Sequence, residues 1–160
     1  EGAKVTISDF YEDRVKEVVA KYGVDSCGLD EIYDLDVDIY APCALGATIN
    51  TNTIGRLKAD IIAGAANNQL QQEDVHGKIV MEKGMIYAPD FALNAGGVIN
   101  CYSEVKGLSS EWAMDKAEAI YTTIHNIVKR SSSENVPTYK IANKMAEERI
   151  ESIGKVKLPL

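Results

Sequence analysis

Two asparagine-containing segments have the residue types needed to bind a flat, polar ligand. Residues 64–70 read Gly-Ala-Ala-Asn-Asn-Gln-Leu, and residues 88–100 read Ala-Pro-Asp-Phe-Ala-Leu-Asn-Ala-Gly-Gly-Val-Ile-Asn. Asn67 and Asn94 each follow a strand-like run and lie among small residues, which let a ligand approach the backbone closely. An asparagine amide offers two donors and an acceptor, which suits a carboxamide or a ribose hydroxyl. Together with Asp9, which ends the first expected strand, they indicate a nucleotide-binding α/β domain.

Alternating strand and helix patterns must position these residues. Apolar spacing predicts strands over residues 5–9, 37–40, 60–63 and 85–87. It predicts helices over residues 15–22, 50–58, 75–83, after Gly97, from Ser110 to a break at 131–133, and after Pro137. Strands that alternate with helices favour a mostly parallel sheet, in which the loops at the carboxyl ends of the strands line a crevice.

Composition limits the class of protein. The chain has 160 residues, of which 46% are hydrophobic, and a formal net charge of −7. This length suits one domain, and the hydrophobic content excludes wholesale disorder. The negative charge argues against nucleic acid or an anionic membrane as a main partner, and simple solubility is the ordinary explanation of such a charge.

Cysteine usage and hydropathy indicate a compartment. Cys27, Cys43 and Cys101 are odd in number, and no Cys-x-x-Cys occurs, so zinc and redox motifs are not expected. Unpaired thiols favour a reducing cytoplasm. The apolar run over residues 61–66 is much shorter than the roughly 20 residues of a membrane helix. We therefore expect a cytoplasmic protein with no membrane partner.

Four segments resemble one enzyme family. They are residues 37–70, residues 86–100, Val-Pro-Thr-Tyr at 136–139 and Ala-Glu-Glu-Arg-Ile at 146–150. In this order they resemble the cofactor domain of the glutamate/leucine/phenylalanine/valine dehydrogenase family, most closely its leucine-acting members. The resemblance implies a Rossmann-like, mostly parallel sheet followed by C-terminal helices. Residues 1–109 would form a partial NAD-binding domain, and residues 110–160 would be helices that pack on it.

One expected motif is missing from the chain. No Gly-x-Gly-x-x-Gly occurs, although a dinucleotide-binding fold carries this loop between its first strand and first helix. We therefore expect the strand at residues 5–9 to be the second strand of such a fold, with the first strand, its loop and a lysine-bearing substrate domain upstream of Glu1. The isolated chain would then be inactive, and we assign it no catalytic residue and no metal site.

The resemblance implies a cofactor site. The implied NAD-binding residues are Asp9, Cys43, Ala44, Leu45, Asn67 and Asn94. A carboxylate at the position of Asp9 can accept both ribose hydroxyls and would repel a 2′-phosphate, which favours NAD over NADP. Alternatives remain for each residue type: Asp9 could cap the next helix, Cys43 could pack in a turn, and the asparagines could be caps or turn residues.

The resemblance also implies one wall of a substrate pocket. Val98 and Cys101 fall on one helix face at a spacing of three, and in the family these positions help to line the pocket for the amino-acid side chain. Their small, apolar character favours a leucine-like substrate, although plain helix packing is the alternative. The implied activity is NAD-dependent oxidative deamination of L-leucine and related branched-chain amino acids by a homo-oligomer. A valine or phenylalanine dehydrogenase and a non-catalytic nucleotide-binding fragment remain as alternatives.

Overall fold

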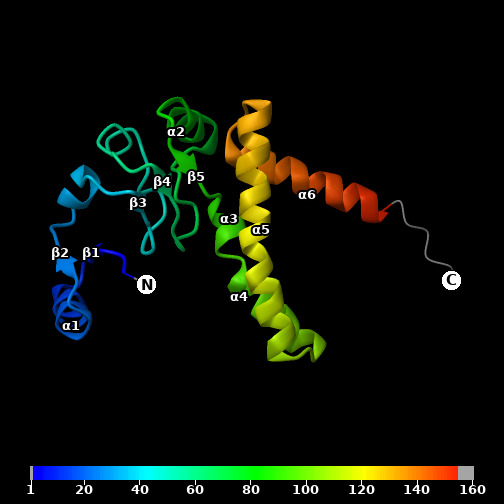
Figure 1. The fold of residues 1–160 in the computed structure, drawn as a ribbon, viewed down its shortest axis with the longest axis horizontal. Helices are drawn as coiled ribbons and strands as arrows, with labels where there is room; N and C mark the ends of the chain where they lie inside the picture. The colour runs from blue at the N-terminus through cyan, green and yellow to red at the C-terminus, as the bar shows by residue number, and fades with distance from the viewer. Residues whose placement is uncertain (1, 155–160) are drawn as a thin grey trace.

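The chain is an α/β protein with two separate parallel sheets, as seen in a computed structural model that describes residues 2–154 (Figure 1). The strands are β1 (Thr6–Ile7), β2 (Asp25–Ser26), β3 (Ile39–Tyr40), β4 (Ile61–Ile62) and β5 (Ile86–Tyr87). The helical elements are α1 (Glu12–Tyr22), the 3-10 helix η1 (Glu31–Asp34), the π-helix η2 (Glu73–Gly77), α2 (Lys78–Glu82), α3 (Asp90–Leu93), α4 (Gly96–Lys106), α5 (Ser110–Glu134) and α6 (Thr138–Gly154). The predicted α/β class is confirmed.

The two sheets do not pair with one another in the described part of the chain. β1 pairs with β2, and the second sheet has the order β3-β4-β5, with Ile39, Ile61 and Ile86 in register. In a doubly wound sheet of order 3-2-1-4-5-6, removing strand 1 leaves a pair and a triplet of parallel strands. The observed pairing has this form, and it leaves one edge of β1 and one edge of β3 open.

Sequence patterning did not predict β2. Asp25 and Ser26 are polar and exposed, so they show neither the alternation nor the apolar run by which a strand is identified. The strand exists because the backbone NH groups of Asp25 and Cys27 donate to the carbonyls of Val5 and Ile7, at 3.0 and 3.1 Å. Long-range pairing, rather than local preference, therefore defines it.

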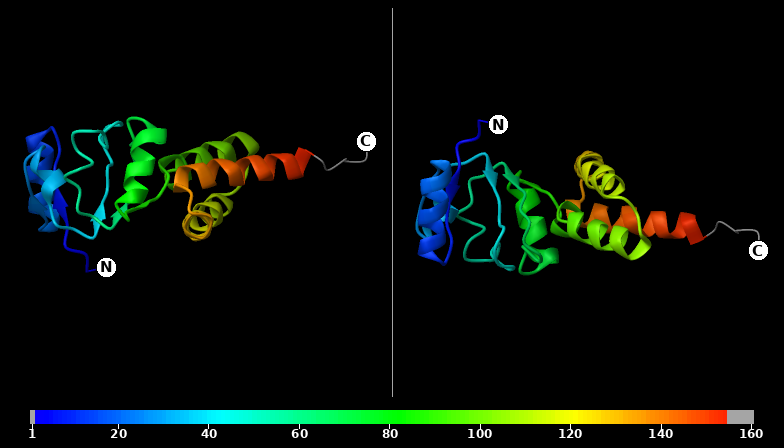
Figure 2. Two further views of the ribbon diagram at one scale, coloured as in Figure 1. Left: turned by 90° about the horizontal axis from the view of Figure 1, so that it is seen from above. Right: turned by 90° about the horizontal axis from the view of Figure 1, so that it is seen from below.

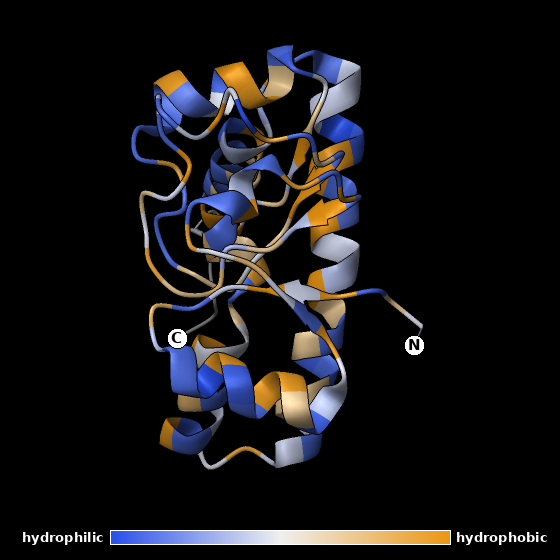
Figure 3. Cartoon of the chain, turned by 90° about the vertical axis from the view of Figure 1, so that its left-hand side faces the viewer, coloured by the Kyte–Doolittle hydropathy of each residue, from blue (hydrophilic) through white to orange (hydrophobic). Residues whose placement is uncertain are grey.

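The main hydrophobic core lies around the three-stranded sheet. Ile49 and Ile62 are completely buried, and Val80 of α2 packs against them. The other buried core members are Tyr40, Ile54, Leu57, Ala59, Leu70, Met85 and Tyr87. Colouring by hydropathy shows hydrophobic and hydrophilic residues side by side around the helices, which is the pattern of helices that bury one face (Figure 3).

The N-terminal β1-α1-β2 unit is held less firmly than the rest. None of the residues from 2 to 39 is buried. Arg56 ties this part of the chain to the second sheet, because its guanidinium donates to Asp30 at 2.7 Å and to Asp34 at 2.6 Å. Tyr33 lies beneath the same guanidinium, with 5.6 Å between the guanidinium carbon and the ring centroid. Arg56 therefore ties the η1 segment, which follows β2, to the turns that precede β4.

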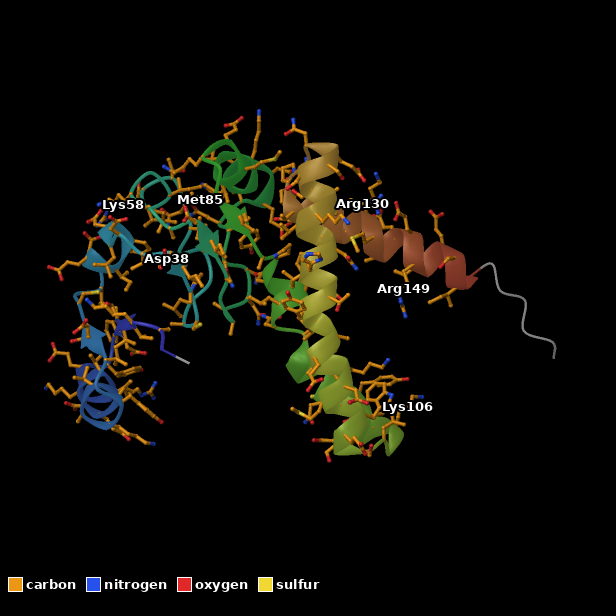
Figure 4. All side chains as sticks on the ribbon, viewed as in Figure 1. Asp38, Lys58, Met85, Lys106, Arg130 and Arg149 are labelled. Carbon is orange, nitrogen blue, oxygen red and sulfur yellow. The ribbon has the colours of Figure 1, made fainter. Side chains whose placement is uncertain are left out.

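The three C-terminal helices form the opposite end of the molecule (Figure 2). α5 packs against both α4 and α6, and a second small core forms around Ile127 and Ile141. Arg130 of α5 donates to both carboxylate oxygens of Glu148 on α6, each at 2.7 Å, and it faces α6 in the view with side chains (Figure 4). This bidentate pair aligns the two helices.

The predicted helix over residues 50–58 is wrong. The segment is a series of turns, although Ile54 and Leu57, the two apolar positions on which the helix prediction depends, are buried. The Thr53 hydroxyl donates to the Thr48 carbonyl at 2.6 Å and accepts from the Asn50 NH at 3.0 Å. Such side-chain hydrogen bonds compete with the helical backbone pattern, so this Thr- and Asn-rich segment folds into turns.

The predicted helix break at residues 131–133 is also wrong, because α5 continues to Glu134 and ends at Asn135 in the left-handed conformation (φ 54°). Ser133 donates to the Arg130 carbonyl and Ser131 to the Val136 carbonyl, so these hydroxyls bond within the helix and to its end. The apolar stripes that predict these two helices include Tyr121, Ile150 and Ile153, yet each of these side chains is more than half exposed.

Candidate functional site

Three loops meet at the carboxyl edge of the three-stranded sheet. They follow β3 (residues 41–47), β4 (residues 63–70) and β5 (residues 88–95). Because parallel strands end at the same edge, their following loops lie next to one another. Two backbone hydrogen bonds join the first two loops: the Ala66 NH donates to the Pro42 carbonyl at 3.0 Å, and the Ala47 NH to the Asn68 carbonyl at 2.7 Å.

Two glycines permit this close packing. A Cβ atom at Gly46 would lie 2.7 Å from the Asn67 carbonyl oxygen, and one at Gly64 would overlap the backbone of Pro42. Neither position has room for the Cβ atom of another residue, so both need glycine for steric reasons. Two of the small residues in these segments therefore let the loops touch.

Gln69 shapes the turn that carries Asn67, and sequence reasoning missed it. Its side chain is completely buried, and its Nε2 donates to the carbonyls of Gly64 and Ala66 at 2.5 and 3.0 Å. Asn68, which lies between Asn67 and Gln69, takes a left-handed conformation with φ 53°, which asparagine adopts more readily than most residues. No sequence pattern separates a buried loop glutamine of this kind from a surface one.

The two predicted asparagines contact one another. Asn94 Nδ2 donates to Asn67 Oδ1 at 2.5 Å and to the Ala65 carbonyl at 3.2 Å. Within residues 2–154, Asn67 Nδ2 and Asn94 Oδ1 have no hydrogen-bond partner, so a donor and an acceptor remain side by side for a ligand. A carboxamide or a sugar hydroxyl group matches this combination.

The predicted residues after β3 border the same place. Cys43 Sγ accepts from the Ala65 NH at 3.5 Å, which puts Cys43 beside the loop of Asn67. Ala44 and Leu45 follow it and are exposed, Leu45 by 74% of its surface. An apolar side chain that stands open next to polar amides can cover the face of a flat ring.

Asp9 belongs to the other sheet and is not brought into contact with the asparagines. Its Oδ1 accepts from the Tyr11 NH at 2.8 Å, which closes a turn just before α1. The residue flanking the start of α1 is Tyr11, and it makes no side-chain cap. Asp9 therefore shapes the approach to the helix, while its second oxygen has no hydrogen-bond partner in the described structure.

Val98 and Cys101 lie on α4, which begins two residues after Asn94. Both are exposed, Val98 by 74%, and they face the same side of the helix one turn apart. Their role as one wall of a substrate pocket stays a prediction.

The titratable side chains near the site suit structure better than proton transfer. Burial, and secondarily the Asp90 carboxylate, raises the pKa of Tyr87, so this phenol stays neutral. His76 is 1% exposed, and its Nδ1 accepts from the Gln72 NH at 3.0 Å while Nε2 lies 3.3 Å from the Thr51 hydroxyl.

Residues 2–154 contain no group of His, Cys, Asp and Glu arranged to hold a metal ion. Across the same range, no helix is long and apolar enough to cross a bilayer.

A comparison with protein families covers nearly all of the described chain. Residues 4–156 match the family described as Glutamate/Leucine/Phenylalanine/Valine dehydrogenase. The chain belongs to this family. All of the predicted site residues therefore lie within the segment that the family describes.

Individual members of the dehydrogenase family are similar over nearly the whole chain. Leucine dehydrogenase from Bacillus cereus is 48% identical over 153 residues, which are 96% of this chain and 42% of that protein. Leucine dehydrogenase from Geobacillus stearothermophilus is 46% identical over 159 residues, with 99% and 43% covered. The crystal structure of L-tryptophan dehydrogenase from Nostoc punctiforme superimposes with a TM-score of 0.92 and 41% identity, covering 96% of this chain and 46% of that one. The chain thus spans less than half the length of these relatives.

Proposed function

We propose that the chain is the cofactor-holding part of an NAD-dependent dehydrogenase that deaminates a branched aliphatic L-amino acid, with leucine as the preferred substrate. The hydrogen bond from Asn94 to Asn67 is the observation that carries the proposal, because it places a free amide donor and acceptor at the strand ends. Residues 1–109 would hold the cofactor, and residues 110–160 would pack against this part. "The complete enzyme" below means this chain joined to the segment that its relatives have and that it does not span.

The proposed cofactor site uses residues of both sheets. Asn67 and Asn94 would bind the nicotinamide riboside through their free amide atoms, and Cys43, Ala44 and Leu45 would line the same end. Asp9 would accept the hydroxyls of the adenosine ribose, which favours NAD because a carboxylate repels a 2′-phosphate. When bound, the nicotinamide supplies the hydride acceptor.

The proposed reaction converts an L-amino acid, water and NAD to a 2-oxo acid, ammonia, NADH and a proton. The reaction would break the Cα–H bond of the amino acid, with the bound nicotinamide as the hydride acceptor. Val98 and Cys101 would contact the aliphatic side chain of the substrate and so orient Cα. The groups that move protons would come from the remainder of the complete enzyme, so the isolated chain would not turn over.

Substrate preference rests on two considerations. Leucine dehydrogenases at 46–48% identity support an aliphatic substrate, and the small side chains of Val98 and Cys101 are compatible with it. The match to L-tryptophan dehydrogenase, at 41% identity, supports an aromatic amino acid as a second candidate. A valine-acting enzyme is a nearer variant of the first candidate, and a phenylalanine-acting enzyme belongs with the aromatic one. A non-catalytic nucleotide-binding fragment is the remaining candidate.

The complete enzyme is proposed to be a cytoplasmic homo-oligomer. Cys27, Cys43 and Cys101 are all unpaired thiols, which suits a reducing compartment. Exposed hydrophobic side chains on α5 and α6, among them Met114, Tyr121 and Ile150, offer a surface for packing between subunits. Light scattering of the purified complete enzyme measures the subunit number directly.

A substrate panel tests the proposed activity. NADH formation by the complete enzyme is measured with leucine, valine, phenylalanine and tryptophan. The proposal predicts the highest kcat/KM for leucine, and no NADH formation by the 160-residue chain at high concentration. A preference for tryptophan would move the assignment to the aromatic branch, and turnover by the isolated chain would mean that its catalytic groups were overlooked.

A further inference from the structure

A buried carboxylate connects the two loops that carry the asparagines. Asp90, the first residue of α3, is only 5% exposed. Its Oδ2 accepts from the Gln69 NH at 3.1 Å, and its Oδ1 accepts from the Phe91 NH at 2.8 Å. A buried carboxylate is costly unless its oxygens are hydrogen-bonded, and here each oxygen has a backbone donor.

The backbone of Asp90 makes a further contact with the second asparagine. Its carbonyl oxygen accepts from the Asn94 NH at 2.8 Å, within the single turn of α3. Gln69, which the carboxylate holds, lies two residues after Asn67. Asp90 therefore binds the backbone of both asparagine loops, and the side-chain hydrogen bond from Asn94 to Asn67 joins the same two loops a second time.

We propose that Asp90 is a positioning residue that holds the Asn67–Asn94 pair in its hydrogen-bonded geometry. Its importance for cofactor binding rests on the proposed function, since the buried carboxylate would act only through the two asparagines. Hydrogen bonds to an ionised acceptor are stronger than those to a neutral one, which suits a tie between two loops. A small displacement of a binding group is costly, because misplacement by about 1 Å can reduce catalytic efficiency by about a hundredfold.

Three variants of the 160-residue chain separate positioning from general stability. Asp90→Asn keeps the side-chain volume, but only one of its two terminal atoms is an acceptor. Either the Gln69 NH or the Phe91 NH would therefore face an NH₂ group. Asp90→Ser is smaller and keeps a hydroxyl at the start of α3, but it is too short to reach the Gln69 NH. Asp38→Asn, at the opposite end of β3, removes the same charge from an exposed position and is the control (Figure 4).

The first readout needs no ligand. Nuclear magnetic resonance of the ¹⁵N-labelled chain reports the side-chain amides of Asn67 and Asn94, and thermal unfolding reports stability. We expect both Asp90 variants to shift these amide signals and to speed hydrogen exchange at the Gln69 NH at least about tenfold, and Asp38→Asn to change neither. Unchanged Asn67 and Asn94 signals in a folded Asp90 variant would overturn the proposal.

The second readout is NAD titration of the same samples. We expect the Asp90 variants to raise the Kd for NAD about tenfold or more, and the control to match the wild type. Altered amide signals with an unchanged Kd would also overturn the positioning role. If the wild-type chain alone shows no saturable binding, the same titration is carried out on the complete enzyme. Absence of NAD binding there overturns the proposed function, and the amide signals alone then decide whether Asp90 positions the pair.

Discussion

Asn94 and Asn67 are 27 positions apart in the sequence, yet their side-chain amides lie 2.5 Å from one another. β4 and β5 are adjacent parallel strands, so each asparagine emerges at the same edge of the sheet. The bond uses one donor of Asn94 and the carbonyl of Asn67, which orients both amides. Each side chain then presents its remaining atoms in a fixed direction, as ligand binding requires.

Removing the Asn94 amide should weaken NAD binding by the complete enzyme. Asn94→Ala removes a ligand acceptor and frees Asn67 to rotate, and a neutral hydrogen bond contributes about 0.5–1.5 kcal/mol. We expect the Kd for NAD to rise about threefold to tenfold in calorimetric titration. Asn126→Ala, an exposed asparagine on α5, should leave the Kd unchanged. Equal effects of the two substitutions would contradict a site role for Asn94.

Asp9 can be tested by separating its charge from its turn. Asp9→Asn keeps a carbonyl oxygen for the Tyr11 NH, whereas Asp9→Ala loses this bond as well. Hydrogen bonds to charged groups contribute roughly 1.5–3 kcal/mol each, so both variants should bind NAD at least about tenfold more weakly. Only Asp9→Ala should also lower the melting temperature. If Asp9→Asn retains wild-type affinity in the complete enzyme, Asp9 serves only the turn.

Enlarging Cys101 should alter substrate choice in the complete enzyme. Cys101→Leu takes space beside the substrate's aliphatic side chain, so leucine should lose more kcat/KM than the smaller 2-aminobutyrate. A change of one or two methylenes in an apolar pocket is worth about 1–3 kcal/mol of discrimination. Val105→Leu, one turn further along α4 and 82% exposed, is the matched control. Equal losses for both substrates would assign Cys101 to packing.

Acid should loosen the tie made by Arg56. Hydrogen bonds from its guanidinium hold the pKa values of Asp30 and Asp34 below their ordinary range, so the folded state binds fewer protons there than the unfolded state. This contribution is present above the ordinary aspartate pKa of about 3.9 and is lost as the pH falls through the lowered values. The urea midpoint should therefore fall more between pH 6 and pH 3 for wild type than for Arg56→Met. Arg149→Met, an exposed arginine on α6, should follow wild type, and parallel curves for all three would contradict this role.

Hydrogen exchange should be fastest in the N-terminal unit. α1 has no buried residue, whereas α5 buries Ile127 to 2% exposure. Segments with few buried apolar contacts open at lower free energy. We expect the central amides of α1 to exchange at least about tenfold faster than those around Ile127, as measured by mass spectrometry or nuclear magnetic resonance. Equal protection would show that the β1-α1-β2 unit opens only with the whole molecule.

Much of the fold was predictable where local patterning and structure agree. β1 alternates apolar and polar residues, and β3, β4 and β5 contain short apolar runs. α1 ends at Gly23, whose positive φ of 67° is typical of a helix terminus. Asn67 and Asn94 could be selected because they follow such runs. The pattern also predicted parallel strands, whose following loops lie at one edge of the sheet. It could not show that the two side chains touch.

The features that sequence reasoning missed depend on contacts distant in the chain. β2 exists through pairing with β1, and the segment around Thr53 forms turns because its hydroxyl binds backbone groups. Gln69 and Asp90 look like ordinary polar loop residues, and only their burial and their bonds to other loops reveal what they do. Residue type alone contains no signal for such roles.

The crystal structure of the complete enzyme with NAD bound is the most direct test of the central claim. The account predicts the nicotinamide riboside within hydrogen-bonding distance, about 3 Å, of Asn67 Nδ2 and Asn94 Oδ1, with the bond between the two asparagines intact. A nicotinamide bound away from the carboxyl edge of β4 and β5, with neither asparagine touching it, would contradict the account.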